Sequence, residues 1–143
     1  MPINYSHLES ILIENCQAGT FITDISGKLI HCNPAFVKMY GYSSKEELLN
    51  ENAVSLYLNI EQRQSYLNEL LKNKHVRNYY LKGVRKDGSL IDLSINSDVY
   101  ENENNGINIV GSVLDITASI GYRAQINESE KKYEDFFQNS LEL

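Results

Sequence analysis

The chain has 143 residues, 42% of them hydrophobic and 22% charged, which is enough for one domain with a hydrophobic core. Its formal net charge is −6, and its basic residues are spread out rather than clustered on one face, so we expect no nucleic-acid partner. No run of about 18 apolar residues occurs, so no membrane contact is expected from this segment. The two cysteines form no CxxC pair, which fits a cytoplasmic, reducing location.

The first part of the sequence predicts a flanking helix and a β-hairpin. Apolar side chains recur at helical spacing over residues 5–16. Two runs rich in strand-forming residues, 21–23 and 29–31, enclose the turn-forming residues 24–27. We therefore expect an amphipathic helix, packed on the domain or on a partner chain, and then two antiparallel strands.

The middle of the sequence predicts several helices. The Asn-Pro pair at 33–34 supplies an N-cap and a first helical residue, so a short helix is expected up to Gly41. Residues 44–47 form a capping box that opens another short helix. Residues 50–58 are ambiguous. A second capping-box pattern precedes residues 60–73, whose apolar spacing of three and four predicts the best helix of the chain.

Three strands are predicted to close the domain, over residues 76–85, 90–99 and 107–114. An Asp-Gly pair makes a tight turn between the first two strands. The second strand alternates apolar and polar residues, which indicates one buried face and one solvated face. The third strand is apolar over much of its length, so we expect it in the middle of the sheet. Helices between two groups of strands indicate an α+β domain with one antiparallel sheet.

Four short motifs follow one another along the chain, and their order and spacing make the set specific. They are Asp24-x-x-Gly27 followed by Asn33-Pro34-Ala35-Phe36; Gly41-Tyr42-Ser43 with Glu47-Leu48; Arg85-Lys86-Asp87-Gly88; and Asp115-Ile116-Thr117. Together they resemble the S-box type of PAS domain, over residues 5–117. Domains of this family serve as sensory and dimerisation modules in bacterial sensor histidine kinases, diguanylate cyclases and phosphodiesterases.

The resemblance implies a PAS fold, in which a five-stranded antiparallel sheet in the order 2-1-5-4-3 is covered on one face by helices that enclose a small cavity. Residues 1–17 are then a flanking helix, 18–117 the PAS domain and 118–143 an exit helix. Residues 130–140 resemble the start of a second PAS domain, the alternative being a frayed helix. We expect a fragment of a longer signalling protein, with effector domains in the same chain and a homodimer formed through flanking helices and sheet.

Each cofactor bound by this family requires recognisable residues in the sequence. Flavin domains that form a covalent adduct carry a Cys in a motif that corresponds to residues 50–58, where no Cys occurs. Haem-binding members carry an axial His where Arg63 stands, and His75 lies beyond the helix end. No metal-ligand spacing and no catalytic motif is present, so neither a metal nor enzymatic activity is expected. Noncovalent flavin stays open.

An unknown small molecule, or no ligand, therefore remains for the cavity. Among the candidate cavity residues, buried tyrosines say most about a ligand, since a buried hydroxyl needs a hydrogen-bond partner. The alternative for every candidate is that it simply packs the core. The candidate ligand-binding residues are Phe21, Ile30, Phe36, Met39, Tyr40, Leu56, Tyr66, Leu70, Tyr79, Leu81, Leu93, Ile95, Ile109 and Val113.

The junction Asp115-Ile116-Thr117 is the expected signal output. Side chains of Asp and Thr cap the first free N–H groups of a helix, so this junction sets the direction of the exit helix. The resemblance implies a basic partner for Asp115, either Arg85 or Lys86. The alternative is a strand-to-helix cap without a signalling role. At the level of function, the sequence leaves open a ligand sensor, a ligand-free dimerisation spacer and, third, a flavin redox sensor.

Overall fold

The computed structural model describes residues 5–104 and 106–120, and its elements follow the predicted order. The helices are α1 (Tyr5–Asn15), α2 (Pro34–Met39), α3 (Lys45–Leu49), the 3-10 helix η1 (Ala53–Leu56) and α4 (Ile60–Asn73). The strands are β1 (Gly19–Asp24), β2 (Leu29–Cys32), β3 (His75–Val84), β4 (Leu90–Glu101) and β5 (Ile107–Asp115). None of the helices in these described ranges is long and apolar enough to cross a membrane.

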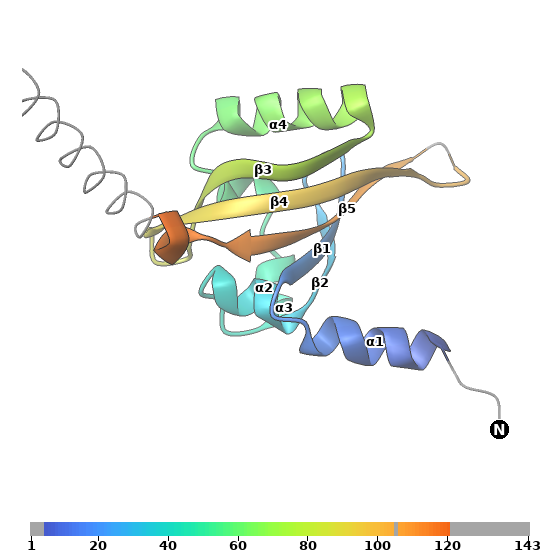
Figure 1. The fold of residues 1–143 in the computed structure, drawn as a ribbon, viewed down its shortest axis with the longest axis horizontal. Helices are drawn as coiled ribbons and strands as arrows, with labels where there is room; N and C mark the ends of the chain where they lie inside the picture. Colours follow the sequence, from blue (N-terminus) through green and yellow to red (C-terminus); the bar gives the residue numbers. More distant parts are fainter. Residues whose placement is uncertain (1–4, 105, 121–143) are drawn as a thin grey trace, which may run out of the picture.

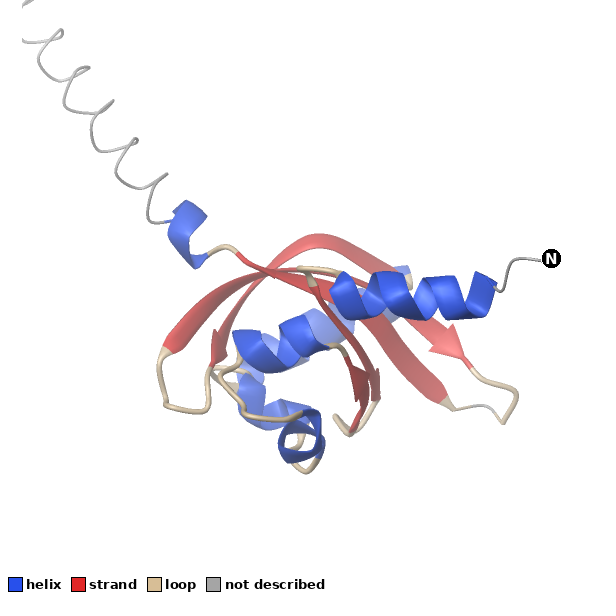
Figure 2. Ribbon diagram, turned by 90° about the horizontal axis from the view of Figure 1, so that it is seen from below, coloured by secondary structure: helices blue, strands red, loops and turns tan. Residues whose placement is uncertain are grey.

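The strands pair into one antiparallel sheet in the order β2-β1-β5-β4-β3, which confirms the predicted α+β class and strand order (Figure 1). The last strand, β5, pairs with both β1 and β4 and is therefore central, as its apolar sequence indicates. The sheet curves around the layer formed by α2, α3, η1 and α4 (Figure 2). Helix α1 extends away from that layer and contacts it at α2 (Figure 1).

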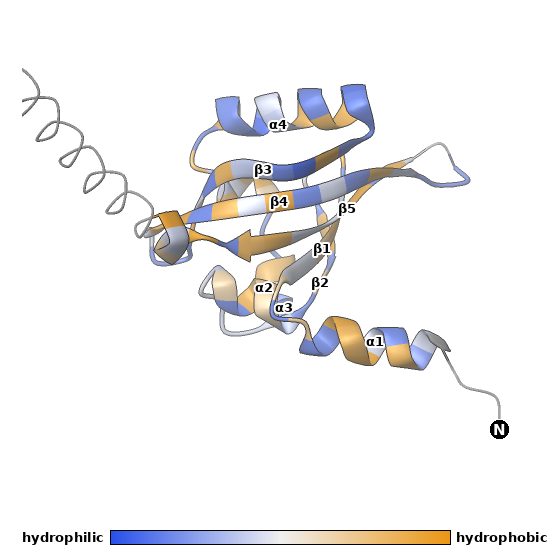
Figure 3. Ribbon diagram, viewed as in Figure 1, coloured by the Kyte–Doolittle hydropathy of each residue, from blue (hydrophilic) through white to orange (hydrophobic). Residues whose placement is uncertain are grey.

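The alternation along β4 places its apolar residues on the helix side of the sheet. Ile91, Leu93 and Ile95 are 0%, 2% and 6% exposed, whereas the residues between them are half-buried on the opposite face. Helix α4 packs its apolar side against β3 and keeps a hydrophilic outer side (Figure 3). Its N-cap is Asn59, whose side-chain oxygen accepts the Gln62 N–H at 2.8 Å. These two amphipathic elements enclose the core between them.

The ambiguous stretch 50–58 becomes the 3-10 helix η1, held by contacts from outside the stretch. The Ala53 N–H donates to the Gly27 carbonyl at 2.7 Å, and Gly27 has a φ of +97° that suits its tight turn. After η1, the Leu58 N–H donates to the Lys82 carbonyl on β3 at 3.2 Å. Long-range backbone bonds thus fix η1 between the β1–β2 hairpin and β3, where it closes one side of the core.

Candidate functional site

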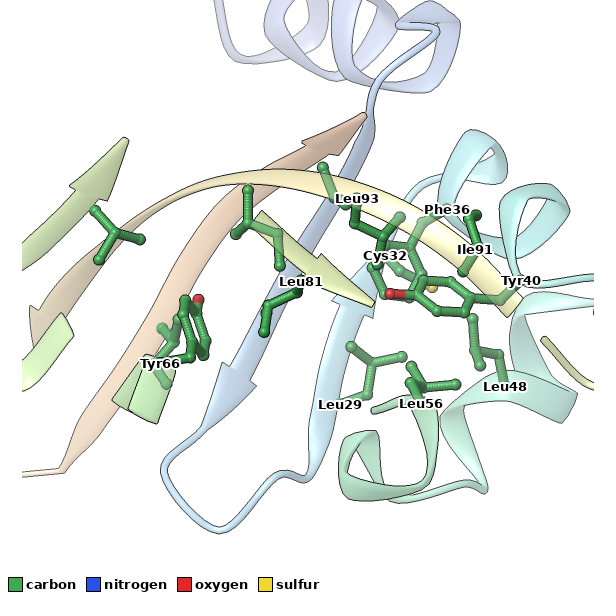
Figure 4. Packing of buried hydrophobic residues seen from close by; sticks show 14 of the residues in the cluster. Leu29, Cys32, Phe36, Tyr40, Leu48, Leu56, Tyr66, Leu81, Ile91 and Leu93 are labelled. Carbon is green, nitrogen blue, oxygen red and sulfur yellow. The ribbon is translucent and has the colours of Figure 1, made fainter. Parts of the chain in front are cut away.

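A cavity of about 40 Å³ lies between the inner face of the sheet and the helices α2, η1 and α4. Aliphatic and aromatic side chains of the core form most of its wall (Figure 4). A buried water needs about 10–15 Å³ of such volume, so the cavity has room for roughly three water-sized groups. Sites for drug-sized ligands are far larger, typically about 300–1,000 Å³.

The structure brings most of the sequence-predicted candidates to this cavity. They come from β1, α2, η1, α4, β3, β4 and β5, so elements distant in sequence share one wall. Whether they bind a ligand stays a prediction. The candidates that line the cavity are Phe21, Phe36, Tyr40, Leu56, Tyr66, Leu81, Leu93, Ile95, Ile109 and Val113.

Four candidates lie elsewhere. Ile30 is 47% exposed, because the alternation of β2 turns Leu29 inward and Ile30 outward, so its placement in the cavity was wrong. Leu70 is fully buried beneath α4 but does not border the cavity, and Met39 is half-buried against the core. Tyr79 lies outside, next to Tyr66, with ring centroids 5.4 Å apart.

Several lining residues were not predicted. Tyr57 belongs to the stretch whose structure the sequence left ambiguous, so its position depended on the β3 contact. The position of Arg63 could have been predicted from the sequence, because it precedes Tyr66 by three residues and so lies on the same side of α4. The unpredicted lining residues are Thr23, Gly27, Leu29, Ala53, Tyr57, Arg63, Leu67, Lys82 and Gly83.

Three tyrosines put phenol groups at the cavity. The Tyr66 hydroxyl pairs with the Ser97 hydroxyl at 2.6 Å, and burial raises the pKa of Tyr66 to about 12. Burial also raises the pKa of Tyr40 and of Tyr57, and each is further raised by the nearby Tyr66. Tyr40 is 5% exposed, and its hydroxyl makes no hydrogen bond within the described residues. That hydroxyl points away from Leu48 and toward the interior of the cluster (Figure 4).

Two basic residues border the cavity, and they differ in where their charged groups lie. Lys82 is paired with Asp92, with Nζ 3.6 Å from Oδ1, and both side chains lie on the outer face of the sheet, away from the cavity. Arg63 donates one hydrogen bond to the Ile25 carbonyl at 3.0 Å and forms no ion pair within the described part of the chain. No described residue of the lining is acidic or a histidine. The polar side chains of the wall are therefore hydroxyl groups, which both donate and accept, and the Arg63 guanidinium.

The histidines that bear on cofactor binding lie away from the cavity. His75 is exposed at the start of β3, and Arg63 stands at the cavity instead of a haem ligand. The His31 Nδ1 lies 3.1 Å from the Lys45 Nζ, and burial lowers the pKa of His31. Within residues 5–104 and 106–120, no group of three or more His, Cys, Asp and Glu side chains is placed to hold a metal.

The junction after β5 is held by a connected set of hydrogen bonds. The Asp115 Oδ1 accepts the Thr117 N–H at 3.0 Å and the Thr117 hydroxyl at 2.6 Å. The Thr117 Oγ1 in turn accepts the Asp92 N–H at 3.0 Å, which ties the junction to β4. Helical backbone begins at residue 117 and continues to 120, while the remainder of the expected exit helix and the segment 130–140 lie outside the described residues.

The basic partner of Asp115 is Arg85, with Nη2 3.5 Å from Oδ2, whereas Lys86 pairs with Glu47 at 2.6 Å. Arg85 and Lys86 also contact the end of α2. The Arg85 Nε donates to the Met39 carbonyl at 3.3 Å, and the Lys86 N–H donates to the Tyr40 carbonyl at 2.9 Å. The turn between β3 and β4 thus bridges the cavity wall at Tyr40 and the junction at Asp115.

Comparison with known proteins identifies the fold. A family model for the PAS domain matches residues 17–118. The solved PAS domain of a protein from Colwellia psychrerythraea has a TM-score of 0.71 and 20% identity, covering 80% of this chain and 99% of that chain. A PAS domain from a two-component sensor histidine kinase has a TM-score of 0.64 and 18% identity, covering 77% and 98%.

An RNA-binding light-oxygen-voltage receptor has a TM-score of 0.70 and 19% identity, with 88% of this chain matching 37% of that chain. At identities this low, the solved structures establish the fold and not the ligand. No curated protein sequence matches the chain.

Proposed function

Because the chain belongs to the PAS domain family, we propose that it is a sensory module of a multidomain signalling protein that binds a small ligand in its cavity. The ligand would act on the exit junction at Asp115, Ile116 and Thr117. A two-component sensor histidine kinase is among the proteins with this fold, and we favour that parent over a diguanylate cyclase. The fragment itself would be a sensor and not an enzyme.

The observation that carries this proposal is the double role of Tyr40. Its hydroxyl faces the cavity without a hydrogen-bond partner among the described residues, and its carbonyl accepts the Lys86 N–H. Arg85, next to Lys86, donates a hydrogen bond to the Met39 carbonyl and forms an ion pair with the Asp115 carboxylate. A ligand that binds better to one position of Tyr40 than to another shifts the position of this turn, and with it the ion pair at the junction.

We also propose that the module works as a cytoplasmic homodimer. Helix α1 exposes Leu12 at 70%, and β5 exposes Val110 and Leu114 on the outer face of the sheet at 39% and 49%. Apolar groups exposed together on a helix and an adjoining sheet face support an interface between copies.

A ligand-free dimerisation spacer is the second candidate, and the small cavity favours it, since about 40 Å³ is far below the volume of ordinary ligand sites. A flavin redox sensor is the third. Some structures with this fold are light-oxygen-voltage proteins, but a flavin would need a cavity several times larger than the one formed here.

Native mass spectrometry of the purified chain tests the proposal. We expect a retained small molecule, and we expect its removal to shift the backbone amide signals of Asp92 and Thr117 in NMR spectra. Tyr40→Phe should abolish that shift, whereas Tyr100→Phe, at a residue 58% exposed on β4, should leave it intact. A chain that retains nothing, and whose junction signals respond to no added compound, would support the spacer instead.

A further inference from the structure

The charge and hydrogen-bonding character of the cavity wall indicates one class of ligand. We infer that the cavity takes a short-chain monocarboxylate such as acetate or propionate, with the carboxylate on Arg63 and the phenol hydroxyls. This inference rests on the proposed sensory function of the same cavity. It assigns the ligand's chemistry, which the fold leaves open, from four features of the wall: its charge, its donors, its volume and its apolar surface.

The charge of the wall selects an anion. Arg63 is its charged member, because the ammonium of Lys82 pairs with Asp92 on the outer face of the sheet, and no described lining residue opposes Arg63 with a carboxylate. Arg63 donates one of its five N–H groups to the Ile25 carbonyl, and the other four have no hydrogen-bond partner among the described residues. A guanidinium matches the two oxygens of a carboxylate in geometry, so Arg63 is the anchor.

The phenols supply further donors next to this cation. Tyr40 is 5% exposed, and within the described residues neither its hydroxyl nor that of Tyr57 has a hydrogen-bond partner. Burial raises the pKa of both groups, so they stay protonated and can donate at neutral pH. Arg63, Tyr57 and Tyr66 all border this one cavity.

The volume of the cavity sets the size of the ligand. About 40 Å³ corresponds to roughly three water-sized positions, which suits acetate and, with a small adjustment of side chains, propionate. A phosphate or a dicarboxylate carries more negative charge than the single guanidinium of Arg63 neutralises. The remaining wall is aliphatic, with Leu29, Leu93 and Val113 all nearly fully buried, and it suits a methyl or ethyl group.

Isothermal titration calorimetry of the 143-residue chain tests the inference with sodium propionate and sodium acetate as the probes. Propionamide, which has the same shape without the charge, is the matched control compound. We expect saturable binding of propionate and at least tenfold weaker binding of propionamide. Arg63→Gln should remove propionate binding, and Tyr57→Phe should weaken it several-fold. Lys72→Gln removes an exposed cation from the same helix and should leave the affinity unchanged.

Each other outcome overturns the inference. Equal affinity for propionamide would show that charge is not recognised, and equal losses in Arg63→Gln and Lys72→Gln would show a diffuse electrostatic effect. Absence of binding by both carboxylates, with a neutral molecule retained in native mass spectra, would overturn the carboxylate while leaving the sensory function standing. Absence of binding together with an empty mass spectrum would remove both.

Discussion

The buried hydrogen bond between Tyr66 and Ser97 offers a quantitative test of the fold. Tyr66→Phe removes one hydroxyl and leaves the Ser97 hydroxyl, which is 0% exposed, without its partner. An unpaired buried hydroxyl costs about 1–3 kcal/mol of folding free energy. We therefore expect Tyr66→Phe to lower the free energy of unfolding by about that amount, and Ser97→Ala to do the same for the converse reason.

The double variant Tyr66→Phe with Ser97→Ala separates this cause from a general loss of packing. Removing both hydroxyls leaves no unpaired group, so the double variant should be more stable than the sum of the two single losses predicts, by about 1 kcal/mol or more. Urea unfolding followed by far-ultraviolet circular dichroism measures all four proteins. Additive losses across the cycle, or a cost of Tyr66→Phe below about 0.3 kcal/mol, would refute the reasoning.

Three further predictions concern pH, the junction and the central strand. Because the pKa of buried Tyr66 is about 12 and that of an unfolded Tyr is about 10, its contribution is complete below pH ~10 and is lost as the pH rises toward ~12. The free energy of unfolding should therefore fall across that window, and it should fall less in Tyr66→Phe. Asp115→Ala should lower the free energy of unfolding by under about 1 kcal/mol, since the carboxylate in its ion pair with Arg85 is 39% exposed. The same substitution should change signalling in the full-length protein, and unchanged output with and without stimulus would count against a signalling role for the junction. Gly111→Ala should destabilise by about 1–3 kcal/mol in thermal melts, because the new Cβ would meet the Asn96 carbonyl oxygen at 2.5 Å, and Ser112→Ala serves as its neighbour control.

Much of the fold follows from local patterns. The helix predicted over 60–73 has those bounds, because its N-cap and its apolar spacing are contained within the segment itself. The alternation along β4 likewise predicts which residues face the core. The motif set that resembles a PAS domain leads to the strand order, which the structure confirms.

The candidate site was predicted in part, and the misses have local causes. Ile30 was assigned to the wrong face, since a strand of four residues carries too little alternation to decide which side is buried. Tyr57 was missed because its stretch has no helical or strand period, and its position comes from the backbone contacts of η1 with the hairpin and β3. The sequence also left Arg85 and Lys86 equivalent as partners of Asp115, and the geometry of their turn selects Arg85.

The sequence by itself determined the elements, their order and the family, because helix caps, turn residues and apolar periods act over a few residues. Only the tertiary structure decided what the cavity is: its volume of about 40 Å³, its lack of acidic lining among the described residues, and the Tyr40 hydroxyl left without a partner there. It also decided that Tyr40 and Asp115 contact the same turn. These properties arise where side chains from distant segments meet, and packing between segments is the part of the free energy that local patterns do not record.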